Sequence, residues 1–202
     1  MEEKYSTIER SFVMIKPDGV ARGLVGKIFL RFEEMGLKLV AARMIKAKKE
    51  QASMHYPGDD EGWLDGIGSK TYASYESDEK AIKKDFETTD KIKIGKIVLE
   101  AMIKYIMKGP VVITVWEGNH AIDRIRSIVG KTIPTIAEVG SIRGMFGVDT
   151  PALAGKTGRI TFKTIVHASD SVKEAQRETK IWFGEKYKDL SKYERIDYTG
   201  LL

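Results

Sequence analysis

The order of its apolar segments constrains the fold of this chain more than any other feature. Short runs rich in strand-forming residues occupy positions 11–15, 37–44, 111–116 and 161–166. Apolar residues recur at helical spacing over 24–35, 121–129 and, after the last strand, 171–183. The order strand, helix, strand, strand, helix, strand predicts an α+β fold. This is the ferredoxin-like βαββαβ arrangement, an α/β sandwich with helices on one face of a four-stranded antiparallel sheet.

Local signals support these boundaries. Gly36 stands where a glycine commonly ends a helix, directly after the first helical pattern. In the second strand Leu37, Leu39 and Ala41 alternate with other residues, which predicts that the three share one face of the sheet.

Two stretches do not belong to the minimal unit. Residues 57–108 contain a Gly/Asp-rich turn region and a helical run over 94–107, and residues 147–161 are rich in Gly, Ala, Thr and Pro. We predict that both are insertions on the surface. A chain of 202 residues can bury one sizeable core, so residues 1–202 are expected to form a single domain.

Composition excludes several classes of protein. The absence of cysteine excludes disulfide scaffolds, thiolate zinc sites and cysteine nucleophiles. No run approaches the roughly 20 apolar residues that span a bilayer, and no signal peptide is apparent, so we expect a cytoplasmic protein without a membrane partner. The net charge of +5 reflects 34 basic and 29 acidic residues. No zinc-finger, basic-zipper or RNP pattern accompanies it, so no nucleic-acid partner is expected.

His167, one of only three histidines, is a candidate nucleophile. It directly follows the predicted strand 161–166 and precedes the last helix, whose start is marked by a capping-box spacing from Ser171 to Glu174. The N-terminus of a helix attracts phosphate, and a neutral imidazole is nucleophilic near pH 7 if its second nitrogen is held by an acceptor. The alternative is a histidine whose hydrogen bonds are merely satisfied at a strand end.

Glu178 could be that acceptor. Helical spacing places it on one stripe with Ser171, Ala175 and Trp182, which should face the sheet. A buried carboxylate needs a partner, and the ring N–H of His167 is in a suitable position. A slight rotation of the helix would instead leave Glu178 as an exposed charge.

The chain has no P-loop. Two Gly-Lys-Thr fragments, at 130–132 and 155–157, lack the required glycine five residues earlier, where Ile125 and Thr150 stand. Phosphates would therefore be held by side chains. Lys16, Arg126 and Arg143 each lie beside a glycine-marked turn and are candidates for this role, although each alone could be a solvated surface charge.

Several segments resemble the nucleoside diphosphate kinase family in the family's own order. They are the stretch 9–26, which contains Lys-Pro-Asp-Gly at 16–19, Gly-Pro-Val-Val at 109–112, Trp-Glu-Gly at 116–118, Ser-Ile-Arg-Gly at 141–144 and Val-His-Ala-Ser-Asp-Ser at 166–171. The last string matches the family's active-site signature. The resemblance covers most of the chain outside the two insertions.

This resemblance implies a ping-pong kinase in which His167 carries the phosphoryl group from a nucleoside triphosphate such as ATP or GTP to a nucleoside diphosphate, with Mg²⁺ as cofactor. It implies a homo-oligomer, a hexamer or a tetramer. It also implies a glutamate that bonds the histidine, a neighbouring serine, a lysine on phosphates and sugar, a tyrosine near the histidine and three phosphate ligands. In this chain these are Glu178, Ser169, Lys16, Tyr56, Arg126, Thr132 and Arg143.

The chain departs from the family at two positions of the nucleotide site. Thr164 stands where the family usually has an asparagine that contacts the sugar, and Trp63 is our candidate for the aromatic residue that stacks on the base, although it could equally be a core tryptophan. An alternative function is therefore a catalytically weak, nucleotide-binding regulatory protein on the same fold. An RNA or DNA binder is disfavoured, since Phe12 and Trp116 are single aromatics in aliphatic strands.

Overall fold

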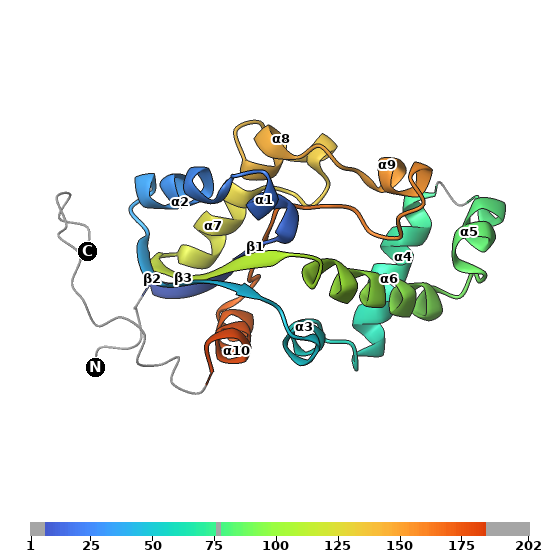
Figure 1. Cartoon of the computed structure of the whole chain (residues 1–202), viewed down its shortest axis with the longest axis horizontal. Coiled ribbons are helices and arrows are strands. Elements are labelled where there is room, and N and C mark those ends of the chain that lie inside the picture. Colours follow the sequence, from blue (N-terminus) through green and yellow to red (C-terminus); the bar gives the residue numbers. More distant parts are fainter. Residues whose placement is uncertain (1–6, 76–77, 185–202) are drawn as a thin grey trace.

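A four-stranded antiparallel sheet forms the centre of the protein (Figure 1). The structure is a computed structural model and describes residues 7–75 and 78–184. The strands are β1 (Ile8–Ile15), β2 (Lys38–Lys46), β3 (Pro110–Asn119) and β4 (Val166–Ala168), in the order β2-β3-β1-β4. This order confirms the predicted ferredoxin-like α+β fold, with β1 in the interior of the sheet.

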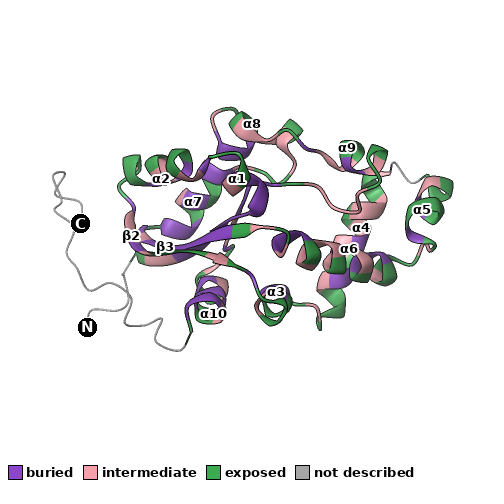
Figure 2. Cartoon of the chain, in the orientation of Figure 1, coloured by how far each residue is buried: buried purple, intermediate pink, exposed green. Residues whose placement is uncertain are grey.

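Helices cover both faces of this sheet. Side chains alternate along β1, so Val13 and Ile15 enter one buried cluster while Phe12 and Met14 enter another. The first cluster lies under α2 (Val25–Glu34) and α7 (Ala121–Val129), the two predicted helices of the ferredoxin-like unit. The second lies over α3 (Lys49–His55) and α10 (Val172–Phe183), so the prediction of helices on one face alone was wrong. Figure 2 shows the resulting buried layers around the strands.

The helix boundaries agree with the sequence signals. Gly36 follows α2 with a positive φ of 73°, a conformation that favours glycine. Ser171 caps α10, because its hydroxyl accepts a hydrogen bond from the backbone N–H of Glu174 at 3.2 Å.

The predicted face of β2 was partly wrong. The pairing of β2 with β3 is irregular between Leu39 and Ala41, where a β-bulge shifts the register. Leu37 and Leu39 pack in the cluster under α2, as predicted, but Ala41 packs in the cluster on the opposite face. An extra residue at a bulge changes which side chains point to which face, and simple alternation cannot anticipate it.

The last strand was also predicted wrongly. It covers Val166–Ala168 and not residues 161–166. The backbone turns sharply at Ile165, whose φ is +66°, and the N–H of Val166 bonds the carbonyl of Thr164 at 2.7 Å. A one-residue turn of this kind is rare and strained for a β-branched residue. His167 therefore lies inside the strand, opposite Met14 of β1, and not after its end.

The described residues of 57–75 and 78–108 form three helices: α4 (Glu61–Ser74), α5 (Glu79–Phe86) and α6 (Lys91–Ile106). Helices α4 and α6 approach closely at two glycines, since a Cβ on Gly68 would lie 1.8 Å from the carbonyl oxygen of Lys91 and one on Gly95 would lie 2.2 Å from that of Leu64. Ile106 at the end of α6 is fully buried in the cluster over α10. This stretch is thus not confined to the surface.

Residues 147–161 pack on these helices. The segment contains α9 (Pro151–Lys156), and Ile160 packs against the buried cluster of Ile82, Phe86, Ile94 and Val98. The side chain of Asp149 links the two ends of this segment. Its carboxylate accepts hydrogen bonds from the Arg159 guanidinium and, at 2.8 Å, from the backbone N–H of Lys163.

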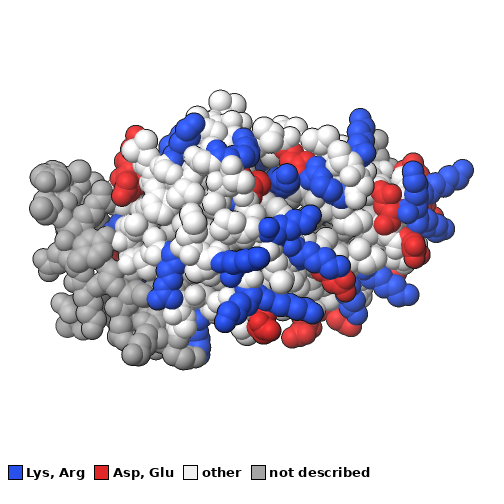
Figure 3. All heavy atoms as spheres, in the orientation of Figure 1, with Lys and Arg blue, Asp and Glu red and all other residues white. Residues whose placement is uncertain are grey.

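Three short elements complete the described structure: α1 (Pro17–Ala21), a 3-10 helix (Pro134–Ile136) and α8 (Ile142–Phe146). Among the described helices, none combines the length and the apolar character that crossing a bilayer requires. Figure 3 shows Lys and Arg side chains interspersed with Asp and Glu across one face of the molecule.

Candidate active site

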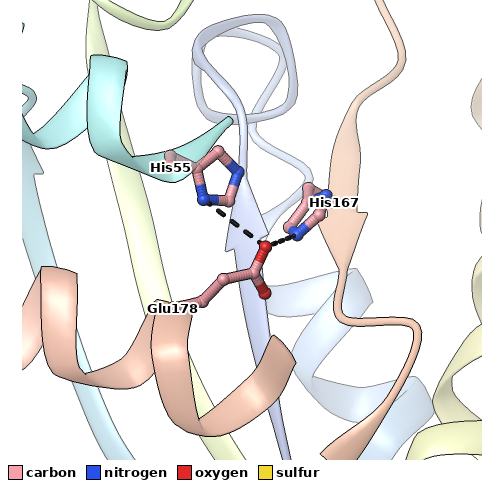
Figure 4. A group of neighbouring side chains, drawn as sticks. All are labelled: His55, His167 and Glu178. Carbon is pink, nitrogen blue, oxygen red and sulfur yellow. Dashed lines mark hydrogen bonds and ion pairs between the residues drawn. The ribbon is translucent and has the colours of Figure 1, made fainter. Parts of the chain in front are cut away.

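His167 lies on the short strand β4 at the edge of the sheet, and α10 returns beneath it (Figures 1 and 4). Its side chain is 26% exposed, whereas the Glu178 side chain on α10 is 4% exposed. The atoms Nε2 of His167 and Oε1 of Glu178 are 2.7 Å apart. The predicted pair is therefore formed, and Glu178 faces the sheet as the helical spacing indicated.

This contact determines which nitrogen can react. Burial lowers the pKa of His167 well below its ordinary value, and the charges of Lys16 and Arg143 lower it further, so the ring is neutral near pH 7. A neutral ring that donates its Nε2 proton to Glu178 keeps a lone pair on Nδ1. Within the described part of the chain, Nδ1 has no hydrogen-bond partner.

Ser169 supports the carboxylate from the other side. Its hydroxyl donates to Oε2 of Glu178 at 2.5 Å and is buried. Burial raises the pKa of Glu178, while His55 and the Ser169 hydrogen bond act in the opposite direction. Since both of its oxygens accept hydrogen bonds, the carboxylate needs no proton of its own.

His55 is a member of this group that the sequence analysis did not select. Its ring is 4.6 Å from that of His167 in an edge-on arrangement, and its Nδ1 accepts a hydrogen bond from Trp182 at 3.3 Å and lies 3.5 Å from Oε1 of Glu178. Burial lowers the pKa of His55 well below 6.5, so it too is neutral. Arg177 fixes the end of α3 by donating to the His55 carbonyl at 2.8 Å. In the sequence, only the position of His55 directly before Tyr56, a predicted site residue, pointed to a role for this histidine.

A pocket of about 900 Å³ opens in front of His167. This volume lies in the range of small-molecule sites. The predicted site residues that line it are Tyr56, Trp63, Arg126, Thr132, Arg143, His167 and Glu178. The structure thus brings together seven predicted residues from distant parts of the chain.

The aromatic residues lie together at one wall of this pocket. The rings of Tyr56 and Trp63 are 6.0 Å apart and tilted by 34°. Trp63 is half-buried and packs partly against the cluster over α10, so both predictions for it, base stacking and core packing, have support. The Tyr56 hydroxyl is buried without a hydrogen-bond partner among the described residues.

Lys16, Thr164 and Ser169 lie behind the pocket wall. The Nζ of Lys16 donates to Oγ1 of Thr164 at 2.9 Å, and both side chains are buried. Burial, with a contribution from Arg143, lowers the pKa of Lys16 to about 8, and Asp18 opposes this shift. Thr164 therefore contacts the lysine directly.

The two arginines differ in their environment. Arg143 is buried, and three of its nitrogens donate to backbone carbonyls: Nε to Thr164 at 3.3 Å, Nη1 to Gly130 at 2.6 Å and Nη2 to Val166 at 2.7 Å. Two of its five N–H donors remain for a ligand. Burial, with a contribution from Arg126, lowers the pKa of Arg143 to about 10, so it stays charged. Arg126 is exposed, and its side chain makes no hydrogen bond or ion pair to a described residue.

Asp170 and Lys131 also line the pocket and were not selected from the sequence. Lys131 pairs with Glu138 at 3.2 Å, whereas Asp170 has no hydrogen bond or ion pair to any described residue. Magnesium in proteins is commonly bound by one or two carboxylates together with substrate phosphates. The pocket fits such an ion, with the exposed Asp123 and Asp170 as carboxylates in its lining. In the cluster of His55, His167 and Glu178, Nε2 of His167 and Nδ1 of His55 already have hydrogen-bond partners, which disfavours this cluster as the metal site.

Comparison with known proteins indicates the family of this chain. The model of the nucleoside diphosphate kinase family matches residues 9–62 and 76–187. A nucleoside diphosphate kinase of Pyrobaculum aerophilum is 42% identical over 89% of this chain and 97% of its own length, and a crystal structure of an NDP kinase from that organism superimposes with a TM-score of 0.84, at 40% identity over 89% and 98% of the two chains.

A second solved structure is a transition-state mimic of nucleoside-diphosphate kinase from Borrelia burgdorferi with bound vanadate and ADP. It is 31% identical, covers 94% of each chain and has a TM-score of 0.71. Fold and site together define a nucleotide-binding transferase. More particularly, the chain belongs to the nucleoside diphosphate kinase family.

Proposed function

We propose that the protein transfers the γ-phosphoryl group of a nucleoside triphosphate to a nucleoside diphosphate by a ping-pong reaction through phosphorylated His167. The observation that carries this proposal is the pairing of Nε2 of His167 with Glu178, at the bottom of a pocket lined by cations. It leaves Nδ1 of a neutral ring as the nucleophile.

In the first half-reaction Nδ1 forms a bond to the γ-phosphorus, and the bond between that phosphorus and the bridging β-γ oxygen breaks. The electron pair of that bond leaves with the nucleoside diphosphate. The positive charge that develops on the ring is stabilised by Glu178, which Ser169 holds in place. The second half-reaction is the reverse, with another diphosphate as acceptor.

The cations supply the remaining stabilisation. Phosphoryl transfer requires mainly in-line positioning and charge stabilisation on the equatorial oxygens. Arg126 and Arg143, with Lys16 behind them, are the positive groups near His167, and Thr132 offers a hydroxyl. Trp63 would hold the base by stacking, which suits an enzyme that accepts many bases.

Bound Mg²⁺ would neutralise phosphate charge, held by the phosphates themselves with Asp170 nearby. ATP and GTP, with the other nucleoside tri- and diphosphates, are the proposed substrates. Thr164, bonded to Lys16, takes the place of a sugar-contacting asparagine.

We also propose a single domain with insertions at about 57–108 and 147–161, a cytoplasmic location and a homo-oligomer, a hexamer or tetramer. The burial of Ile106 in the cluster over α10 supports the single domain. Met44 on β2 is 62% exposed, and an exposed apolar side chain of this size supports association between copies. Light scattering coupled to size-exclusion chromatography measures the assembly.

The test of function uses ATP labelled at the γ-phosphate. Wild-type protein is expected to become labelled in an acid-labile, base-stable form and to release the label as GTP when GDP is added. His167→Ala is expected to remain unlabelled. His120→Asn is the matched control, because His120 is exposed and its φ of +48° is tolerated by asparagine.

The alternative function gives a different result. A nucleotide-binding regulator would bind ATP, measured by calorimetry, and would remain unlabelled although well folded. Label that persists in His167→Ala would contradict the assignment of the nucleophile.

A further inference from the structure

The turn that precedes His167 is held by contacts from several elements. Ile165 lies two residues before His167 and has a φ of +66°, which is strained for a β-branched residue. Its carbonyl accepts a hydrogen bond from the backbone N–H of Lys16 at 2.7 Å. Arg143 bonds the carbonyls on either side, those of Thr164 and Val166. Such a conformation persists only where the surroundings determine it.

The N–H of Ile165 is bound by a side chain from the other end of the sequence. It donates to Oδ2 of Asp18, on α1, at 3.1 Å. The other oxygen of the same carboxylate accepts a hydrogen bond from the hydroxyl of Tyr105, in the last turn of α6. Asp18 and Tyr105 are each 8% exposed, so this chain of bonds lies out of solvent.

Hydrogen bonds to a buried carboxylate are stronger than neutral ones, and removing one leaves the carboxylate under-satisfied. The hydrogen bonds from Tyr105 to Asp18 and from Ile165 to Asp18 therefore fix the turn through its N–H, while Arg143 binds the two flanking carbonyls. The same turn bears the carbonyl that Lys16 binds and leads directly into His167.

We propose that Tyr105 is a positioning residue for phosphoryl transfer, which acts through Asp18 to hold the strained turn at Ile165 and thereby the placement of His167 and Lys16. This inference rests on the proposed function. It gives α6 a direct part in the reaction.

The test replaces the hydroxyl alone. In Tyr105→Phe the rate of single-turnover phosphorylation of His167 by ATP is expected to fall about 10- to 100-fold, because misplacement of reacting groups by about 1 Å costs rates of this order. The Kd for ADP, measured by calorimetry, is expected to change less than about threefold, since Tyr105 does not line the pocket. Rates are expressed per folded molecule, measured by near-ultraviolet circular dichroism.

Tyr75→Phe is the matched control. The Tyr75 hydroxyl also bonds a carboxylate, that of Asp85 at 2.8 Å, but neither residue lines the pocket. This variant is expected to keep the wild-type rate. If wild type itself is not labelled, the proposed function fails. If wild type and both tyrosine variants react equally fast per folded molecule, only the role of Tyr105 is refuted.

A double-mutant cycle tests the route through Asp18. In an Asp18→Ala background, Tyr105→Phe is expected to cause no further loss of rate, because the intermediate group is already absent. If the losses of rate from the two substitutions multiply, Tyr105 acts by another path, and the proposal is overturned. Such a path could run through the ring of Tyr105, which lies 6.0 Å from Nζ of Lys16.

Discussion

Glu178 accepts a hydrogen bond from Nε2 of His167 at 2.7 Å and so determines the tautomer of the ring. Glu178→Gln keeps the size of the side chain but can present an amide N–H₂ to Nε2, which favours the proton on Nδ1 and removes the nucleophile. We expect the rate of phosphoenzyme formation to fall about 10²-fold or more. Rapid-quench measurement with labelled ATP gives this rate. Glu100→Gln, an exposed substitution on α6, is the control.

Activity is expected to decline on the alkaline side as Lys16 loses its proton. The pKa of Lys16 is lowered to about 8, so the positive charge is complete below pH 7 and largely lost by pH 9. The pH dependence of kcat/KM reflects the ionisation of groups in the free enzyme and should show this decline at alkaline pH. Lys16→Arg, though slower, should lack it, because a guanidinium stays charged over this range. A wild-type profile that is flat to pH 9.5 would contradict this role for Lys16.

Arg143 and Arg126 should differ in their effect on stability. Arg143→Lys leaves at least one of three buried carbonyls without its donor, so we expect the free energy of unfolding to fall by about 3 kcal/mol together with activity. Arg126→Gln should reduce activity and change stability by less than about 0.5 kcal/mol, because the side chain is exposed. Urea denaturation measures the change in stability of each variant, and steady-state kinetics measures its change in activity. Equal losses of stability would contradict the distinction.

Trp63 should affect the binding of all bases alike. Stacking of a base on an aromatic ring contributes about 1–3 kcal/mol, so Trp63→Ala is expected to raise the KM for ADP and GDP about 10-fold or more. Trp63→Phe should retain most of the affinity. A change in the melting temperature without a change in KM would identify Trp63 as a packing residue only.

Much of the fold could be predicted because it depends on local periodicity. Helix α7 spans the predicted residues 121–129, and Ser171 caps α10 as its capping box indicated. The bulge in β2 and the turn at Ile165 could not be predicted. Apolar, β-branched residues favour a strand at 161–166, whereas tertiary contacts to Lys16, Asp18 and Arg143 hold Ile165 in its strained conformation.

Part of the candidate site, like part of the fold, could be predicted from the sequence. The pairing of His167 with Glu178 follows from helical spacing, and seven predicted residues line one pocket. His55 and Tyr105 were missed, because their roles depend on which distant side chains they contact. Arg143 was selected as a phosphate ligand, but its bonds to three backbone carbonyls could not be read from sequence.

The hydrogen bond between Lys16 and Thr164 joins residues 148 positions apart. On the ribosome β1 is made early, yet one of its two neighbours in the sheet, β4, and the helix that carries Glu178 are made more than 140 residues later. A nascent chain therefore cannot carry a phosphoryl group until α10 has left the exit tunnel. Until then the flank of β1 that will receive β4 has no partner strand, and a chaperone could bind the growing protein there.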